Sequence, residues 1–317
     1  MAVILTNLSN QLYESSRHRL NASATRAGID NIRSYDFEDI KKTPFYAGNR
    51  AILDRPTGMG YWLWKPYIIL EALKNTADGD IVVYADCGLE ITTPLDTLLA
   101  LCREENPILL FGNGDFINAT WTKRDCFIYM NCDRPYYWNA PQCDAAFCVF
   151  QRSDTSLRFV TEWLEYCRDP RIITDDPNTA GRRDLPGFRE HRRDQSVLSL
   201  LAAAGKLPLY RMPSQFGNHY KAPSLRVNAE INYTNQNDRR QLDYYAAIPY
   251  YNSPYGQLLD HHRGQDRNPS AGQKQQSLVD MIRRATYKRY TRWRNANALK
   301  KEDKPVPENI IPADDKR

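Results

Sequence analysis

The stretch IVVYADCG, residues 81–88, decides the fold class of this 317-residue chain. Its uninterrupted run IVVYA is typical of a strand buried on both faces in a parallel sheet. Asp86 follows at the carboxyl end of that strand, and Gly88 permits a tight turn directly after it. In open α/β sheets ligands bind at the carboxyl ends of the strands, so Asp86 is a candidate site residue. The alternative is an aspartate that only caps the following turn.

Strands and helices alternate along the chain on both sides of this stretch. Apolar runs predict strands at 2–8, 31–37, 107–112 and 145–153. Helical patterns predict helices at 13–26, 65–75, 95–106, 156–167 and 194–204. This alternation is typical of an α/β fold, with a mainly parallel central sheet and helices on both faces. From about residue 206 the pattern weakens into loops and short strands, so we expect the core domain to end near residue 270.

The composition is that of a globular protein. Apolar residues make up 42% of the chain, and 43 Lys and Arg against 38 Asp and Glu give a net charge of +5. No apolar run reaches about 18 residues, so the pattern predicts no spanning helix. The first residues, MAVILTNLSN, lack the basic start of a signal peptide. The seven cysteines form no C-x-x-C pair, so we expect reduced thiols in a cytosolic chain.

The positive charge is concentrated near the carboxyl terminus. Residues 274–301 contain nine Lys or Arg and one acid, Asp280. An apolar stripe predicts a basic amphipathic helix over 271–301, followed by a flexible tail at 302–317. Such a helix suits an anionic membrane surface. The alternatives are an ordinary helix with a solvated basic face, or a nucleic-acid-binding protein that acts through this helix.

The block GMGYWLWKPYIIL, residues 58–70, combines aromatic side chains with a cation. Trp62 and Trp64 flank Leu63, and Lys65 precedes a proline that suits the first turn of a helix. Aromatic planes beside a cation can bind a base, a sugar face or a phosphate. Packing in the core is the more common use of such aromatics, whereas Lys65 stays a candidate for binding.

The block EHRRDQSVLSLLAAAG, residues 190–205, places a polar cluster at a predicted helix start. His191, Arg192 and Arg193 precede Asp194 and Gln195. Asp194 could simply complement the helix dipole. A helix start also presents backbone N–H groups to an anion, so the cluster is a second candidate site.

A weaker block, QFGNHYKAPS at 215–224, lies in a predicted loop. His219 and Lys221 could supply a metal ligand and a phosphate partner there, although a lone loop histidine is more often only exposed. The chain contains no G-x-x-x-x-G-K-[ST] motif, no G-x-G-x-x-G after the first strand and no G-x-S-x-G. This argues against P-loop NTPases, dinucleotide oxidoreductases and serine hydrolases.

Taken together, the blocks resemble a known family over about residues 1–225. SATRAGID, GYWLWKPYIIL, GDIVVYADCG, CDAAFCVFQRS, EWLEYCRDPRIITDDPN and HRRDQSVLSLL follow one another in this order, from residue 23 to residue 201. Their order and spacing are similar to those of bacterial and viral GT-A glycosyltransferases of capsule, O-antigen and surface-glycan pathways. The resemblance implies a single Rossmann-like GT-A domain over 1–270 that binds a nucleotide-diphosphate sugar.

The resemblance also implies roles for individual residues. Asp86 would be the first acid of a DxD-type motif that holds Mn²⁺ or Mg²⁺ on the diphosphate. Gly88 stands where that motif has its second acid, so either another ligand such as His219 or Glu90 completes the site, or the metal is dispensable. The further residues implied on the donor side are Arg19, Ser23, Lys65, Gly88, His191 and Lys221. Asp194 and Gln195 would lie near the transferred sugar as catalytic residues.

The resulting prediction is a hexosyltransferase-like enzyme that moves a sugar to a glycan or lipid-linked acceptor. Asp194 would be the general base of an inverting transfer, or would stabilise an oxocarbenium-like centre in a retaining one. We expect a cytoplasmic protein without a nucleic-acid partner, with peripheral attachment at the inner face of the membrane as an option. A non-catalytic nucleotide-sugar-binding relative is the main alternative.

Overall fold

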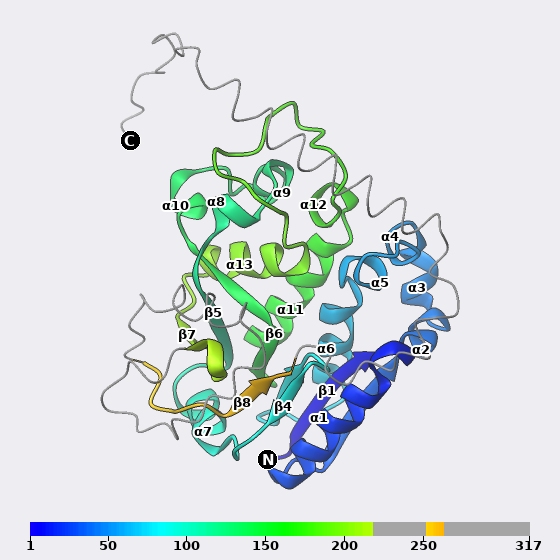
Figure 1. Cartoon of the computed structure of the whole chain (residues 1–317), viewed down its shortest axis with the longest axis vertical. Coiled ribbons are helices and arrows are strands. Elements are labelled where there is room, and N and C mark those ends of the chain that lie inside the picture. Colours follow the sequence, from blue (N-terminus) through cyan, green and yellow to red (C-terminus); the bar gives the residue numbers. More distant parts are fainter. Residues whose placement is uncertain (218–251, 263–317) are drawn as a thin grey trace. The chain divides into compact units, whose positions relative to one another are not determined.

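The computed structural model describes residues 1–217 and 252–262. Within these residues the predicted α/β architecture is confirmed, because one central sheet carries helices on both of its faces (Figure 1). The predicted helix at 271–301 and tail at 302–317 lie outside the described residues. The domain boundary near residue 270 also stays a prediction.

The central sheet has six strands in the order β2-β1-β3-β6-β5-β7. They are β1 (Val3–Ser9), β2 (Asn31–Asp36), β3 (Ile81–Ala85), β5 (Ile108–Ile117), β6 (Pro141–Gln151) and β7 (Leu209–Arg211). The sheet is mainly parallel, as predicted, and only β6 runs against its two neighbours. The direction of β6 was not predicted, because a strand covered on both faces is apolar whichever way it runs. Two further strands, β4 (Leu89–Ile91) and β8 (Leu259–His261), form a separate antiparallel pair.

The five long helices agree with the predicted ones. They are α1 (Glu14–Arg26), α6 (Trp64–Lys74), α7 (Asp96–Glu104), α11 (Asp154–Cys167) and α13 (Asp194–Ala204). Short helices were not predicted, because one or two turns leave no periodic pattern. They are α2 (Phe37–Lys41), α3 (Pro44–Gly48), α4 (Arg50–Leu53), α5 (Gly58–Tyr61), α8 (Asn118–Trp121), α9 (Arg124–Tyr129), α10 (Pro135–Trp138) and α12 (Pro170–Ile173), with 3₁₀ turns at Gln11–Tyr13 and Gln215–Gly217.

Strand β3 lies at the centre of two hydrophobic layers. Val82 and Tyr84 pack in the layer that contains α6, α11 and α13. Ile81, Val83 and Ala85 pack in the layer that contains α1 and α7. Successive side chains of a strand point to opposite faces, and the whole strand is fully buried. The predicted burial on both faces is therefore confirmed, whereas β3 is parallel to β1 and antiparallel to β6.

The strand order of the sheet changes direction at β1, because the next two parallel strands lie on opposite sides of it. The connection through α1 places β2 on one side of β1, whereas β3 pairs with its other side. A crevice at the carboxyl ends of two such strands is the usual ligand site of open α/β sheets. Asp86, directly after β3, lies at this edge.

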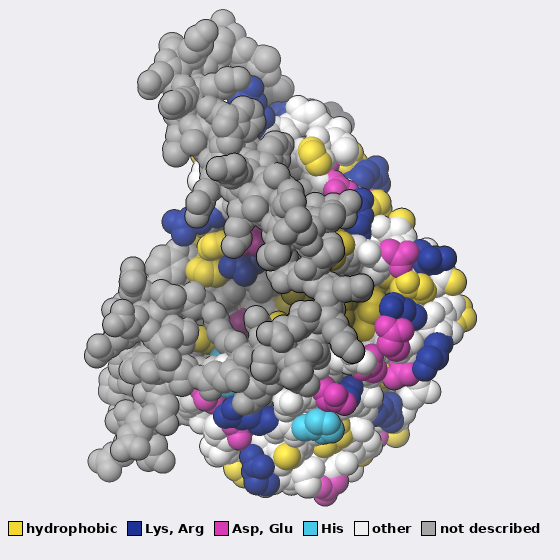
Figure 2. Space-filling view, turned by 45° about the vertical axis from the view of Figure 1, so that its right-hand side comes forward, with side chains coloured by type: hydrophobic (Ala, Val, Ile, Leu, Met, Phe, Trp, Pro, Cys, Tyr) yellow, Lys and Arg dark blue, Asp and Glu magenta, His cyan; other side chains and the backbone are white. Residues whose placement is uncertain are grey.

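The surface of the described residues is mixed in charge. On the face shown in Figure 2, Lys and Arg side chains alternate with Asp and Glu. Among the described residues, no helix combines the length and the apolar character needed to cross a bilayer. All seven cysteines are buried and unpaired, as expected from their spacing.

Candidate functional site

Three charged side chains meet at the carboxyl end of β3. The Nζ atom of Lys65 lies 3.3 Å from Oδ1 of Asp86 and 3.3 Å from Oδ2 of Asp194. It also donates a hydrogen bond of 2.9 Å to the carbonyl oxygen of Ala145 on β6. The side chains of Lys65 and Asp194 are only 4% and 5% exposed, whereas that of Asp86 is 37% exposed. Three blocks that the sequence analysis singled out separately thus form one cluster.

Burial controls the protonation of this cluster. Burial raises the pKa of Asp194 to about 6, although the charge of Lys65 opposes the shift. Burial alone would lower the pKa of Lys65, but Asp194 and Asp86 together raise it above its ordinary value. At neutral pH we therefore expect an ammonium between two carboxylates, with one negative charge in excess.

Tyr84 is a member of the cluster that the sequence analysis missed. Its hydroxyl donates to Oδ1 of Asp86, and its ring centroid lies 5.2 Å from Nζ of Lys65. Burial and then the charge of Asp86 raise its pKa well above the ordinary value, so the phenol keeps its proton. A signal was present, because residues 84 and 86 are two apart and side chains two apart in a strand share a face.

The backbone that leads to Lys65 is left-handed. Gly58, Met59, Gly60, Tyr61 and Trp62 all have positive φ, between 54° and 89°. The left-handed helical conformation costs about 1–2 kcal/mol for each non-glycine residue. Glycine is required in the middle of the turn, since a Cβ on Gly60 would lie 2.5 Å from Cα of Leu53.

The aromatic residues of this turn belong mainly to the core. Tyr61 and Trp64 are buried, and Trp62 is half-buried against the same hydrophobic layer. The indole N–H of Trp64 donates 3.0 Å to the carbonyl oxygen of Gly58, which ties the turn to α6. The packing interpretation of these aromatics is therefore confirmed.

The residue before Asp194 also has a positive φ, although its ψ of −119° differs from that of the turn. Arg193 has a φ of 55° and forms ion pairs with Asp175 at 2.8 Å and with Glu190 at 3.1 Å. Its guanidinium carbon lies 5.7 Å from the ring centroid of Trp62. The two strained segments that precede Lys65 and Asp194 therefore contact each other. Burial raises the pKa of Asp175, although Arg193 opposes the shift.

Gln195 is oriented by a buried relay of polar side chains. Its Nε2 donates 2.8 Å to Oε1 of Gln142, and Nε2 of Gln142 donates 3.0 Å to the hydroxyl of Thr122. Gln142 is fully buried in β6. A single glutamine in a strand carries no recognisable pattern, so Gln142 was not predicted.

Three residues predicted on the donor side are engaged inside the fold instead. The Ser23 hydroxyl is fully buried, accepts from the Ile91 N–H and donates to the Leu20 carbonyl. The ring of His191 is buried, with Nδ1 accepting from the Lys123 N–H, so Nε2 donates to the carbonyl of Ile172. Burial lowers its pKa well below the ordinary value, as a neutral ring requires.

The third of these residues, Arg19, is bound to Glu90, through Nε at 2.7 Å. Its position on α1 therefore joins the helix to β4. Neither Ser23, His191 nor Arg19 belongs to the Lys65 cluster. His219 and Lys221 lie outside the described residues, and Gly88 follows Asp86 in the turn before β4.

Unsatisfied polar atoms gather at the carboxyl end of β1. Within the described residues, four buried oxygens there have no hydrogen-bond partner: Oδ1 of Asn7, Oγ of Ser9, Oδ1 of Asn10 and Oγ of Ser16. Most buried polar groups in proteins are paired, so such a group of acceptors requires an explanation. These atoms come from the end of β1 and the start of α1, on the β1 side of the edge where Asp86 lies.

The described residues do not by themselves fit a metal ion. They contain no group of three or more His, Cys, Asp or Glu side chains that could hold one. Oδ1 of Asp86 already accepts from Tyr84 and faces the ammonium of Lys65. Glu90, named as an alternative ligand, is paired with Arg19 and Arg26. Metal dependence therefore stays a prediction.

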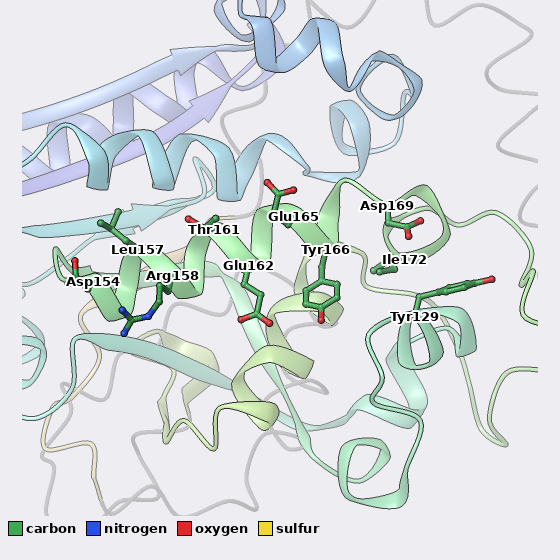
Figure 3. Close-up of a pocket in the computed structure, with 10 residues that line it drawn as sticks. All are labelled: Tyr129, Asp154, Leu157, Arg158, Thr161, Glu162, Glu165, Tyr166, Asp169 and Ile172. Atoms are coloured by element: carbon green, nitrogen blue, oxygen red, sulfur yellow. The ribbon is translucent and has the colours of Figure 1, made fainter.

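A cavity of about 670 Å³ lies elsewhere, along α11. Figure 3 shows its lining side chains, including Arg158, Glu162 and Tyr166 on α11 and Tyr129 on α9. None of its lining residues belongs to the Lys65 cluster.

No protein-family model and no curated protein matches this sequence. Among solved structures, the chain is similar to mouse xyloside xylosyltransferase 1 in its apo form, with a TM-score of 0.45 and 9% identity over 85% of this chain and 100% of that one. It is also similar to the apo WbbM bifunctional glycosyltransferase (TM-score 0.43, 11% identity, 84% of this chain and 46% of that one). A third similar structure is the galactosyltransferase LgtC with donor and acceptor sugar analogues (TM-score 0.37, 12% identity, 83% and 88%). Likenesses this distant concern the fold and carry no conclusion about activity.

Proposed function

We propose that this protein is a glycosyltransferase that moves a sugar from a nucleotide-diphosphate donor to a glycan or lipid-linked acceptor. The observation that carries the proposal is the cluster of Lys65, Asp86 and Asp194 at the carboxyl end of β3. Three blocks far apart in the sequence converge there, at the edge of the sheet where ligands of this fold class bind.

The neighbouring end of β1 supports a nucleoside as part of the ligand. Among the described residues, the amide oxygens of Asn7 and Asn10 are acceptors without a partner, and the Ser9 hydroxyl, which can accept or donate, also has none. The amino groups of a base and the hydroxyls of a ribose are donors that would satisfy them. A donor bound across β1 and β3 would then present its diphosphate and sugar to the Lys65 cluster.

The ammonium of Lys65 is engaged by protein groups and is not a free cation in this structure. Its ammonium has three acceptors around it: Asp86, Asp194 and the carbonyl of Ala145. It therefore holds the two carboxylates in a fixed arrangement. This supports Lys65 as a positioning residue, and its predicted direct contact with the diphosphate stays a prediction.

Asp194 is the residue suited to proton transfer. Its pKa of about 6 leaves it largely ionised at neutral pH. That pKa is also near the working pH, as suits a base that takes a proton from an acceptor hydroxyl. In a retaining reaction the same carboxylate would instead stabilise positive charge at the sugar. The buried relay through Gln142 would keep the Gln195 amide beside it in a fixed orientation.

Binding and hydrolysis of a panel of nucleotide sugars test the proposal, with and without Mn²⁺ and after chelation. We expect turnover of at least one donor by the wild-type chain and a loss of turnover in Asp194→Asn. Binding without turnover would favour a non-catalytic nucleotide-sugar-binding protein. If no nucleotide sugar binds and Asp86→Ala changes nothing, the proposal is wrong. A dependence on Mn²⁺ that Asp86→Ala abolishes would support the predicted metal.

A further inference from the structure

A pair of arginines lies on an aromatic platform next to the proposed catalytic residues. The rings of Phe116 and Trp121 stack with centroids 4.5 Å apart. The guanidinium carbon of Arg192 lies 4.5 Å from the Trp121 centroid, and that of Arg189 lies 5.8 Å from the same centroid. Guanidinium groups stack readily on indole faces and still present their N–H groups to a ligand.

Backbone hydrogen bonds fix this arrangement. The N–H of Arg189 donates 2.8 Å to the carbonyl of Thr120, and the N–H of Arg192 donates 2.9 Å to the carbonyl of Trp121. The segment that carries both arginines is thus tied at two points to α8. The platform is consequently part of the folded scaffold and not two side chains that happen to meet.

The platform is rich in donors but has no matching acceptors. Among the described residues, no carboxylate forms an ion pair with Arg189 or Arg192, whereas Arg193 pairs with both Asp175 and Glu190. Nε of Arg192 and Nε1 of Trp121 are buried and have no hydrogen-bond partner there. Both positive charges lie within 5.8 Å of one indole centroid, so the platform is a locally positive surface that favours an anion.

The position of the platform indicates which substrate carries the anion. Arg192 lies two residues before Asp194, and Thr122, next to Trp121, is the end of the relay that orients Gln195. The polar atoms suited to the nucleoside lie at the end of β1. In the sheet, β1 lies on one side of β3, whereas β5, which leads into α8, lies beyond β6 on the other side. The platform therefore lies on the side of Asp194 away from the proposed nucleoside position.

From this arrangement we infer that Arg189 and Arg192, held on Trp121, bind an anionic group of the acceptor, a phosphate or a carboxylate. That the bound molecule is the acceptor rests on the proposed function. That it carries an anion rests on the geometry of the platform alone. Arginine pairs bind both kinds of anion through paired N–H donors.

Titrations with three small probes test the inference: glucose 1-phosphate, methyl glucuronide and the neutral methyl glucoside, each followed by NMR. The wild-type chain should bind one or both anionic probes more tightly than the neutral one, and the stronger of the two identifies the anion. Arg189→Gln/Arg192→Gln should weaken that binding by about tenfold or more, because charged hydrogen bonds are lost. Arg192→Lys, which keeps the charge, should retain part of the binding.

Arg183→Gln is the matched control, since Arg183 is an exposed arginine of the same loop. It should leave the binding of all three probes unchanged, and a thermal unfolding curve checks that every variant folds. Equal binding of charged and neutral probes, or an unchanged affinity in the double variant, would overturn the inference. So would a parallel loss of UDP binding, because the pair would then belong to the donor site. Arginine-dependent anion binding in a chain that binds no nucleotide sugar would overturn the proposed function and leave the anion site standing.

Discussion

Two charge clusters in this molecule have the same pattern and very different surroundings. Lys65 lies between two carboxylates, and Glu90 lies between the guanidinium groups of Arg19 and Arg26. The side chain of Lys65 is 4% exposed, whereas Arg26 is 64% exposed. The ion pair of Lys65 and Asp194 is shielded from water, whereas Arg19 and Glu90 are 34% and 21% exposed. Water therefore weakens the Glu90 cluster more than the Lys65–Asp194 pair.

The backbone differs between the two clusters as well. Arg19 and Arg26 extend from α1, a regular helix of 13 residues. Five residues with positive φ, 58–62, precede Lys65 by a few positions. Asp194 directly follows Arg193, whose φ of 55° and ψ of −119° are a different and rarer backbone conformation. Backbone strain of this kind persists only where the surrounding structure enforces it, and it concentrates at functional sites. Both differences point to the Lys65 cluster as the functional one.

The strongest test of this comparison removes the central charge of the buried cluster. Lys65→Met should lower the free energy of unfolding by about 3–5 kcal/mol, because it leaves buried Asp194 without its counter-charge. Urea denaturation at neutral pH measures the change. The double variant Lys65→Met/Asp194→Asn should recover part of the loss, since it removes the unpaired charge. A loss below about 1 kcal/mol would place this cluster in the same class as an exposed ion pair.

The next effect is a pH dependence that belongs to Asp194. Burial raises its pKa from 3.8 to about 6 in the folded chain. The folded state therefore binds this proton more tightly than the unfolded state, and its stabilisation is lost as the pH rises from about 4 to about 6. If Asp194 has its proposed role, activity should change in the opposite sense and rise through pH 6, because that role requires the ionised carboxylate. Asp194→Asn should remove this contribution to the stability profile and lower turnover by about 10²–10⁴-fold at neutral pH.

A smaller effect is expected from the strained turn before Lys65. Gly60→Ala would place a Cβ 2.5 Å from Cα of Leu53 at a φ of +89°. We expect a loss of about 2 kcal/mol or more in the free energy of unfolding, and lower activity because Lys65 is displaced. Gly48→Ala is the control, since its Cβ would meet nothing within 4 Å. Similar melting temperatures for the two variants would show that the turn is not constrained.

The smallest effect is expected in the cluster of Glu90 with Arg19 and Arg26. Arg19→Gln should change the free energy of unfolding by less than about 1 kcal/mol, as is usual for a partly exposed ion pair. It should leave the affinity for a nucleotide sugar unchanged, because Arg19 is bound to Glu90. Glu90→Gln removes the other partner of this ion pair and should likewise leave the affinity for a nucleotide sugar unchanged. A large loss of donor affinity in Arg19→Gln would instead support the role that the family resemblance implies for this arginine.

Much of the fold could be predicted from local pattern. The strands around IVVYA and the five long helices follow from apolar runs and helical spacing, which depend on the nearest neighbours in the sequence. The antiparallel direction of β6 could not be predicted, because AAFCVFQ is covered on both faces and looks the same in either direction. The left-handed turn was equally hidden, since Met59, Tyr61 and Trp62 are not residues that favour positive φ.

The candidate site divides in a similar way. Asp86, Lys65 and Asp194 could each be singled out, because a charge beside an apolar strand or at a helix start stands out in the sequence. His191 was singled out by its place at the same helix start, and Ser23 only by the family resemblance. Both side chains satisfy buried backbone groups, those of Lys123 and Ile91. In a sequence, a polar side chain that faces a ligand site cannot be distinguished from one that hydrogen-bonds to buried backbone groups.

Local sequence patterns suffice to predict the α/β class, the order of the main elements and the three charged residues at the ends of those elements. These properties depend on the hydrophobic period and on residues close together along the chain. Packing in three dimensions set the remaining features: Lys65 stands between Asp86 and Asp194, and Tyr84 joins them. Arg189 and Arg192 lie on Trp121 with no carboxylate partner among the residues that the structure describes. The reason is that ion pairing and burial depend on distances between α6, β3, α8 and α13, which are set by packing and not by sequence neighbours.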